Sequence, residues 1–196
     1  MTIRIPNLVL ASGSPRRREI LSSLGLPFSV FTSEVDETPL PGETPRELAV
    51  RLARLKALYA SSKTSGVCLG ADTVVDVDGA AFGKPRDRAE ALFMLRTLSG
   101  RKHAVHTGIA LTSGAIVQSG FETTTVFFGR LSEAEIRDFL ESGEGDDKAG
   151  AYAIQGRGAL LVERIEGCYF NVVGLPVFRL NAMLKEFINR LRREEM

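Results

Sequence analysis

The sequence has little of what marks a secreted, membrane-spanning or nucleic-acid-binding protein. Cysteine occurs only twice, at Cys68 and Cys168, which is too few for a disulfide framework and fits a reducing cytoplasm. No apolar run approaches the length that spans a bilayer, and no secretion signal is recognisable. The formal net charge is +1, so no general positive field attracts nucleic acid or an anionic membrane. We therefore expect a cytoplasmic protein that binds any anion locally.

What the sequence does contain is typical of one globular domain. Its 196 residues are 44% hydrophobic and 25% charged, which is enough to bury a proper core. Stretches with strand and helix periodicity alternate. We expect strands near residues 3–11, 27–33, 66–79 and 158–167 and two long strands within 102–129, and helices that start near Pro15, Pro45, Asp87, Ser132 and Pro176. This alternation, with an antiparallel pair in the middle, predicts a mixed α/β fold in a single domain over residues 1–196.

Three arginines follow one another where the first strand meets the first helix, in the segment SGSPRRR at residues 12–18. A helix N-terminus already carries partial positive charge, so arginines there cost free energy unless an anion lies opposite them. Ser12 offers a hydroxyl group, and Arg16 and Arg17 add forked donors that suit phosphate oxygens. A solvated helix start with exposed arginines is the alternative. This segment alone does not decide between the two interpretations.

Two further segments combine charge with small residues. Asp72 and Thr73 interrupt an apolar strand in GADTVV, which indicates a strand end that opens onto a site or a hydrogen-bonded structural aspartate, and favours the site. Lys84 follows soon after in the sequence, so its ammonium group can approach the carboxylate of Asp72. The glycine-rich segment 145–158 is either a surface loop or a loop packed against a ligand or another segment. Its apolar residues favour packing.

Carboxylates and basic side chains come from separate segments of the chain. Magnesium prefers a few carboxylates, with substrate phosphates and waters completing its shell, and arginine and lysine neutralise the remaining charge. The sequence therefore predicts chemistry on a polyphosphate, assisted by magnesium or manganese. The candidate residues are Glu37, Asp72 and Asp147 for the metal and Arg16, Arg17, Lys56 and Lys84 for the phosphates.

His103 and His106 form an H-x-x-H pattern, which is a weak signal for zinc. Both lie in a predicted strand, where residues three positions apart point to opposite faces of the sheet. Neither a cysteine nor a third histidine stands nearby in the sequence. We therefore do not expect these two histidines to bind a metal ion together.

These segments occur together, in the order LASGSPRRREIL, EVDET, GADTVV, GKPRD, LSG, TGIAL, DKAGAYAIQG and VVGLP. In them the chain, from about residue 8 to 180, resembles the Maf family of nucleoside triphosphate pyrophosphatases, which is related in fold to the inosine triphosphate pyrophosphatases. The resemblance implies a curved mixed β-sheet flanked by helices, with two lobes around a deep cleft. It also implies hydrolysis between the α and β phosphates, which yields a monophosphate and pyrophosphate with the help of a divalent cation.

The resemblance also assigns roles to residues. It implies that Asp72 is the catalytic aspartate, acting as the base for the attacking water, as a metal ligand, or as both. Glu37 matches the acidic partner in the family motif. The phosphate-binding positions of the family match Ser12, Arg17, Lys56 and Lys84.

The family divides by substrate, and three positions distinguish its branches. The branch that prefers 7-methyl-GTP has tryptophan, glutamine and glutamate where this chain has Arg16, Thr73 and Gln155. The resemblance is therefore to the dTTP/UTP branch, with modified pyrimidine triphosphates as further substrates. A 7-methyl-GTP pyrophosphatase and a non-catalytic nucleotide-binding regulator of cell division are the alternatives. A homodimer is expected from the family alone.

Overall fold

The computed structural model describes residue 5 and residues 7–194 of the chain. Its seven strands form one sheet in the order β2-β1-β3-β5-β6-β7, with β4 paired to β3. Strand β1 is parallel to β2 and to β3, and the other pairs are antiparallel. The predicted mixed α/β class is thus confirmed. The strands are β1 (Leu8–Ala11), β2 (Phe28–Val30), β3 (Val67–Val77), β4 (Ala80–Phe82), β5 (Lys102–Ser113), β6 (Ile116–Phe128) and β7 (Val162–Glu166).

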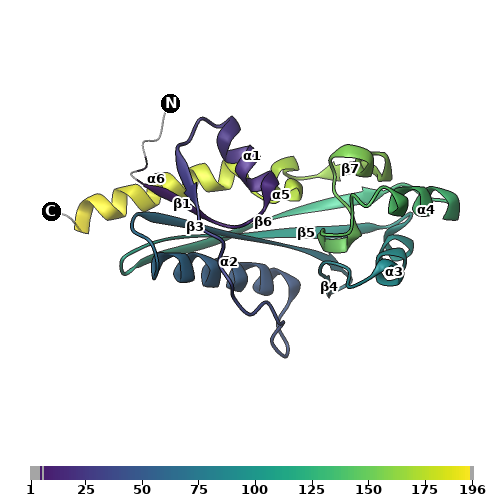
Figure 1. Ribbon diagram of the computed structural model, residues 1–196, viewed down its shortest axis with the longest axis horizontal. Coiled ribbons are helices and arrows are strands. Elements are labelled where there is room, and N and C mark those ends of the chain that lie inside the picture. Colours follow the sequence, from purple (N-terminus) through teal and green to yellow (C-terminus); the bar gives the residue numbers. More distant parts are fainter. Residues whose placement is uncertain (1–4, 6, 195–196) are drawn as a thin grey trace.

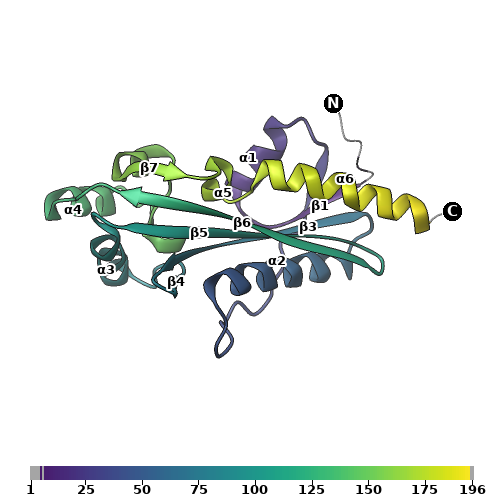
Figure 2. The ribbon, with the colours of Figure 1, turned by 180° about the vertical axis from the view of Figure 1, so that it is seen from behind.

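Six helices flank the sheet, and two short 3₁₀ segments cover Ala149–Ala151 and Gly156–Leu161. Helix α2 runs along one face of the long strands, α1 and α6 lie on the other face, and α3, α4 and β7 gather at the far end (Figures 1 and 2). No helix in residues 7–194 is long and apolar enough to cross a membrane. The helices are α1 (Pro15–Ser23), α2 (Pro45–Ser61), α3 (Arg88–Leu98), α4 (Glu133–Glu141), α5 (Tyr169–Val173) and α6 (Val177–Glu194).

Two apolar clusters lie along the long strands. One packs α1 and α6 against β1, β3 and β5, with Leu21 and Phe187 fully buried at its centre. The other packs α3 and α4 against the opposite ends of β3, β5 and β6, around Leu95 and Phe139. Since the long strands carry both clusters, they join two groups of elements.

Helix α2 lies close to the sheet because glycines of two strands face it. A Cβ atom at Gly70 would lie 2.1 Å from the carbonyl oxygen of Ala53, and one at Gly108 would lie 2.2 Å from that of Ala49. Ala49 and Ala53 are themselves 0% exposed. The absence of side-chain bulk on both surfaces lets the helix backbone touch the strands. This close packing brings Lys56 of α2 over β3.

One edge of β3 is left open in the middle. Strand β1 pairs with Val67–Gly70, and β4 pairs with Val75–Val77. Within the described part of the chain, residues 71–74 therefore have no strand beside them on this edge, although β5 pairs with them on the other. Asp72 and Thr73 lie in this gap and point to opposite faces of the sheet, because side chains alternate along a strand.

Most of the expected elements form, and the differences have local causes. An Asp-Gly turn closes the β3–β4 hairpin, with positive φ values of 53° at Asp78 and 86° at Gly79. The strand expected at 158–167 is wrong in its first half, since residues 156–161 form a 3₁₀ helix. A Cβ at Gly158 would lie 1.9 Å from the carbonyl oxygen of Ala153, so the chain folds back on itself there. Residues 3, 4 and 6 of the first expected strand lie outside the described residues.

Candidate active site

A cavity of about 490 Å³ opens over the unpaired edge of β3. Its walls come from the segment after β1, the start of α1, helix α2, the β4 region, the loop after α4 and helix α5. This volume is typical of sites for small ligands. Five cationic side chains and three carboxylates line it, so positive charge is concentrated here although the net charge of the chain is only +1. They are Arg16, Arg17, Lys56, Lys84 and Lys148, and Glu37, Asp72 and Asp147.

Arg17 is a buried cation whose protein partners are neutral oxygen atoms. Its Nε donates to the carbonyl oxygen of Gly174 at 2.8 Å, and its two terminal nitrogens donate to the hydroxyls of Ser12 at 2.9 Å and Thr73 at 3.1 Å. Among the described residues, no carboxylate lies within 4.0 Å of Arg17. A guanidinium carries five N–H groups, so two remain for a ligand. A cation buried at 8% exposure beside a cavity is suited to an anion.

The three adjacent arginines have different environments. Arg17 is buried, Arg16 is half-buried and lines the cavity, and Arg18 is exposed and donates weakly to the carbonyl oxygen of Gly13 at 3.4 Å. Burial lowers the pKa of Arg16 and of Arg17, and nearby Glu19 and Asp72 oppose this effect at the respective residues. The arginine run therefore supplies two charges to the cavity and one to solvent.

Asp72 and Glu37 meet at one lysine. Lys56 Nζ lies 2.5 Å from Asp72 Oδ1 and 2.7 Å from Glu37 Oε1. Lys56 and Asp72 are both 9% exposed, whereas the side chain of Glu37 is 56% exposed. Burial raises the pKa of Asp72, and the charges of Lys56 and Arg17 partly offset this rise. The ion pair with Lys56 thus holds Oδ1 of Asp72 in place.

The three carboxylates proposed for a metal ion do not form one cluster. No group of three acidic, histidine or cysteine side chains in the described part of the chain is arranged to hold a metal ion. Asp147 pairs with Lys148, while Glu37 and Asp72 share Lys56. Glu37 and Asp72 therefore lie together as a pair, and Asp147 does not join them. Such a pair still fits magnesium, which commonly takes one or two protein carboxylates and completes its shell with phosphates and water.

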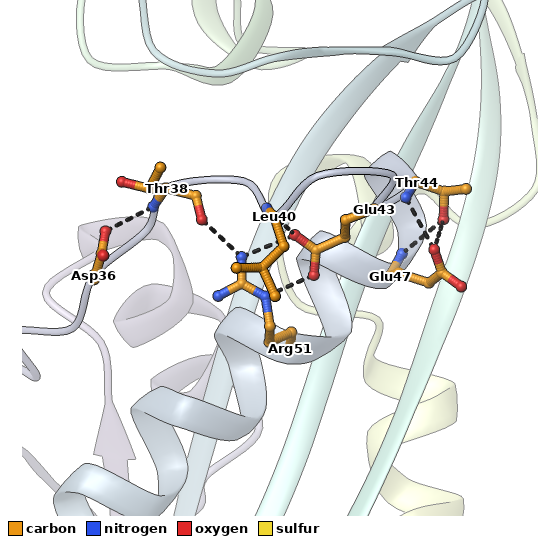
Figure 3. Close-up of polar contacts among 7 residues, drawn as sticks. All are labelled: Asp36, Thr38, Leu40, Glu43, Thr44, Glu47 and Arg51. Atoms are coloured by element: carbon orange, nitrogen blue, oxygen red, sulfur yellow. Dashed lines mark hydrogen bonds and ion pairs between the residues drawn. The ribbon is translucent and has the colours of Figure 1, made fainter.

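The loop between β2 and α2, which carries Glu37, is tied to α2 through Arg51 (Figure 3). Arg51 holds both carboxylate oxygens of Glu43, at 2.6 and 2.8 Å, and donates to the carbonyl oxygen of Thr38 at 2.9 Å. Thr44 and Glu47 form a capping box at the start of α2. These contacts fix both ends of the segment that follows Glu37 and so limit where its carboxylate can lie.

The remaining predicted residues lie at different depths. Ser12 is buried, Thr73 is half-buried, and Lys84 is exposed at the cavity wall. Gln155 is exposed and is not among the residues that line the cavity, although its neighbour Ile154 is. Nine of the ten candidate residues therefore surround one cavity, and Gln155 lies outside it.

Part of the cavity wall is apolar, and several of its residues belong to the glycine-rich segment 145–158, whose apolar side chains favoured packing. Tyr152 is buried there, and its hydroxyl lies 2.7 Å from His103 Nε2. His106 instead contacts Thr123 at 2.9 Å and Asp76 at 3.1 Å, so the two histidines have separate surroundings. The apolar wall also includes Val75, Val105, Ala149, Ile154 and Val172.

The site residues predicted from the sequence did not include Lys148 or Gly174, which both line the cavity. Lys148 stands in the glycine-rich segment 145–158, whose mixture of charge and small residues was the available signal. Gly174 acts through its backbone carbonyl, which accepts from Arg17. A backbone contact between residues 157 positions apart leaves no signal in the side-chain pattern.

Comparison with known proteins identifies the family and the fold of the chain. The family described as "Maf-like protein" matches residues 7–187. A protein of Pelotomaculum thermopropionicum named dTTP/UTP pyrophosphatase is 51% identical over 183 residues, covering 92% of this chain and 96% of that protein. A protein of Clostridioides difficile with the same name is 48% identical over 186 residues, covering 93% and 96%. A HAM1 protein from Coxiella burnetii shares the fold, with a TM-score of 0.53 and 20% identity over 92% of this chain and 98% of that one. The chain therefore belongs to the Maf-like protein family.

Proposed function

We propose that the protein hydrolyses nucleoside triphosphates, with dTTP, UTP and modified pyrimidine triphosphates as substrates, to the monophosphate and pyrophosphate. The observation that carries this proposal is the buried guanidinium of Arg17, which has neutral protein partners and lines a cavity with four further cationic side chains. Lys56 and Lys148 are paired with carboxylates of the cavity, so the charges left for a ligand are those of Arg16, Arg17 and Lys84, which suit an anion of several charges. The two relatives at 51% and 48% identity carry the name of this activity.

The triphosphate binds along the charged side of the cavity. Arg16, Arg17 and Lys84 neutralise its phosphates, and the hydroxyl of Ser12 keeps Arg17 in place at 2.9 Å. The nucleoside then lies against the apolar wall around Tyr152. Positioned positive charge of this kind stabilises the negative charge that builds on the leaving pyrophosphate.

Asp72 acts as the base of the reaction. It accepts a proton from the water that attacks the α-phosphorus, while the bond from that phosphorus to the bridging oxygen breaks and pyrophosphate leaves. Lys56 holds Oδ1 of Asp72 at 2.5 Å, which leaves Oδ2 for the water. Burial raises the pKa of this carboxyl and so makes it a stronger base once it is ionised.

Glu37 and Asp72 are the residues that would hold a magnesium or manganese ion. When bound, such an ion supplies charge neutralisation and orientation for the phosphates. Lys56 lies between the two carboxylates at hydrogen-bond distance from both and keeps them close together. Asp147, paired with Lys148 on the same cavity, is proposed as a further contact to a metal ion or to its water shell.

Selectivity for the base is assigned to Arg16, Thr73 and Gln155. The amide of Gln155 can both donate and accept, as a uracil-type edge requires. Gln155 follows Ile154 of the cavity wall, so its backbone is next to the site. We further propose that the protein works in the cytoplasm, where its two free cysteines remain reduced, and that it forms a homodimer.

The experiment that tests the function is pyrophosphate release from dTTP, UTP, CTP, 7-methyl-GTP and ITP, with magnesium, with manganese and with a chelator. We expect metal-dependent release that is fastest for dTTP and UTP. Release from 7-methyl-GTP or ITP alone would overturn the substrate assignment and keep the reaction. Binding of triphosphates without release would instead favour the non-catalytic regulator.

The substitution Asp72→Asn tests the role of the aspartate. The amide keeps the shape of the side chain and can still accept from Lys56, but it cannot take a proton from water. We expect the pyrophosphate release rate to fall by about 10³-fold or more while the thermal midpoint changes little. A variant with the wild-type rate would show that Asp72 is not the base.

A further inference from the structure

Three polar side chains lie buried behind the cavity and have no part in the reaction proposed above. Thr107 on β5, Thr124 on β6 and Asn171 on α5 are each 0% exposed. Burying a hydroxyl or an amide costs free energy unless the group is hydrogen-bonded. None of the three lines the cavity, yet their hydrogen bonds lead to it.

A chain of hydrogen bonds connects Asn171 to Arg17. The Oγ1 of Thr107 lies 2.8 Å from the backbone carbonyl oxygen of Asn171, and a carbonyl only accepts, so the Thr107 hydroxyl donates there. The Oγ1 of Thr107 then accepts from Thr73 Oγ1 at 3.0 Å. Thr73, whose own hydrogen is used, accepts from Arg17 Nη2 at 3.1 Å. One buried carbonyl group therefore sets the direction of the whole chain.

The carbonyl group at the end of this chain is itself held by the sheet. Asn171 Nδ2 donates to the carbonyl oxygen of Val105 at 2.9 Å and to Thr124 Oγ1 at 3.0 Å. Thr124 Oγ1 also lies 3.0 Å from both the backbone nitrogen and the carbonyl oxygen of Cys168. Helix α5 is thus attached to β5 and β6 at two points. Its carbonyl groups have little freedom to move.

Gly174 brings the end of α5 against the same arginine. Its carbonyl oxygen accepts from Arg17 Nε, and its φ of 120° is one that glycine tolerates best. A Cβ at Gly174 would lie 3.4 Å from Thr73 Oγ1 and 3.7 Å from Arg17 Nε. Arg17 is therefore held by α5 twice, directly through Gly174 and indirectly through Thr107 and Thr73.

We propose that Thr107 is a positioning residue of the active site. By fixing the hydroxyl of Thr73 as an acceptor, it holds the guanidinium of Arg17 in one orientation and leaves the two remaining N–H groups to the phosphates. Without the Thr107 hydroxyl, Thr73 can rotate and Arg17 loses a fixed partner. The inference rests on the proposed function, since it concerns how that site holds a polyphosphate.

The substitution Thr107→Val tests this role, because it keeps the side-chain shape and removes the hydroxyl. Thr112→Val is the matched control: Thr112 lies on the same strand, is 0% exposed, and its hydroxyl has no hydrogen-bond partner among the described residues. We expect T107V to raise the KM for dTTP and the Kd for inorganic tripolyphosphate, measured by calorimetry, about tenfold, with kcat changed less than about threefold. We expect T112V to leave the KM and the Kd unchanged. Thr107→Ser, which keeps a hydroxyl, should leave both close to their wild-type values.

Several results would overturn the proposal. Equal KM and Kd values for T107V and T112V would show that the Thr107 hydroxyl does not position Arg17. A T107S variant with KM and Kd values as high as those of T107V would show the same. If T107V does not fold, Thr73→Val breaks the same chain from its other end, and an unchanged tripolyphosphate Kd in that variant contradicts the proposal. Wild-type protein that binds tripolyphosphate but releases no pyrophosphate refutes the proposed activity instead, and the Kd values still decide on Thr107.

Discussion

Arg17 is a buried cation with three hydrogen bonds to neutral oxygen atoms, and it lies next to an exposed arginine that has almost no contacts. The two side chains differ in their surroundings rather than in their chemistry, because α1 turns one of them towards α5 and the other towards solvent. A guanidinium presents five N–H donors on three nitrogens in a planar fork, so it can reach acceptors that lie farther apart than those around the single nitrogen of an ammonium. The geometry of the site therefore depends on arginine at position 17 and not at position 18.

Arg17→Lys and Arg18→Lys make a matched pair of substitutions at this scale. Arg17→Lys keeps the charge but cannot reach Gly174, Ser12 and Thr73 together. We expect kcat/KM for dTTP to fall by about 100-fold or more in Arg17→Lys, and to stay within about twofold of wild type in Arg18→Lys. Equal activity of the two variants in the pyrophosphate-release assay would contradict the assignment of Arg17 to the phosphates.

At the scale of elements, the contact between α2 and the sheet decides where Lys56 lies. The helix touches β3 and β5 through glycine and alanine, and Lys56 reaches Asp72 only because of this close approach. The loop before α2 depends on the same helix, since Arg51 of α2 holds it next to Glu37. A change in the separation of helix and sheet would therefore displace both partners of Lys56.

The substitution Gly108→Ala tests this dependence. Its Cβ would lie 2.2 Å from the carbonyl oxygen of Ala49, so the helix must move away from the strand. We expect the free energy of unfolding, measured with urea, to fall by about 1–3 kcal/mol, and the pyrophosphate-release rate to fall with it. Gly129→Ala is the control, because a Cβ there meets nothing closer than 3.9 Å. If both variants unfold at the wild-type urea concentration, α2 is not held at this contact.

For the whole molecule, a buried histidine connects the sheet to the cavity loop. His103 of β5 is 4% exposed, packs edge-on against Phe128 and Tyr152, and shares a hydrogen bond with the Tyr152 hydroxyl. Burial lowers the pKa of His103 to about 4. Burial also raises the pKa of Tyr152, so the phenol stays neutral. Protonation of His103 therefore acts against the folded state as a whole.

This pKa predicts a pH dependence of stability. The folded-state pKa of His103 is about 4, whereas an unfolded histidine titrates near 6.5. The contribution of the neutral His103 side chain to the free energy of unfolding is therefore fully present above about pH 6.5 and is lost as the pH falls towards 4. We expect the free energy of unfolding to decrease by roughly 3 kcal/mol over this range. Urea titrations at several pH values should show a smaller decrease in His103→Gln, which does not titrate. Parallel curves for the two proteins would refute the assignment.

Much of the secondary structure could be predicted because its signals are local. Helices α1 and α2 begin at a proline, and α3 and α4 begin at the N-caps Asp87 and Ser132, as expected. Each of these signals depends only on residues within about one helical turn. The 3₁₀ segment before β7 was missed because it depends on Gly158 packing against Ala153, a contact that a strand-like apolar pattern does not reveal. Helix α5 was missed as well, since five residues are too few to establish a period.

The sequence by itself determined the mixed α/β class, the positions of most helices and strands, and the residue types that gather at the site, because periodicity, caps and charged interruptions are properties of neighbouring residues. Only the tertiary structure decided which arginine is buried and that Gln155 lies outside the cavity. It also decided that Lys56 contacts both Glu37 and Asp72, while Asp147 pairs with Lys148 instead. It also decided that Thr107 contacts Thr73 and Asn171, 34 and 64 positions away. Such contacts arise from strand register and helix packing between distant segments, and no local pattern encodes them.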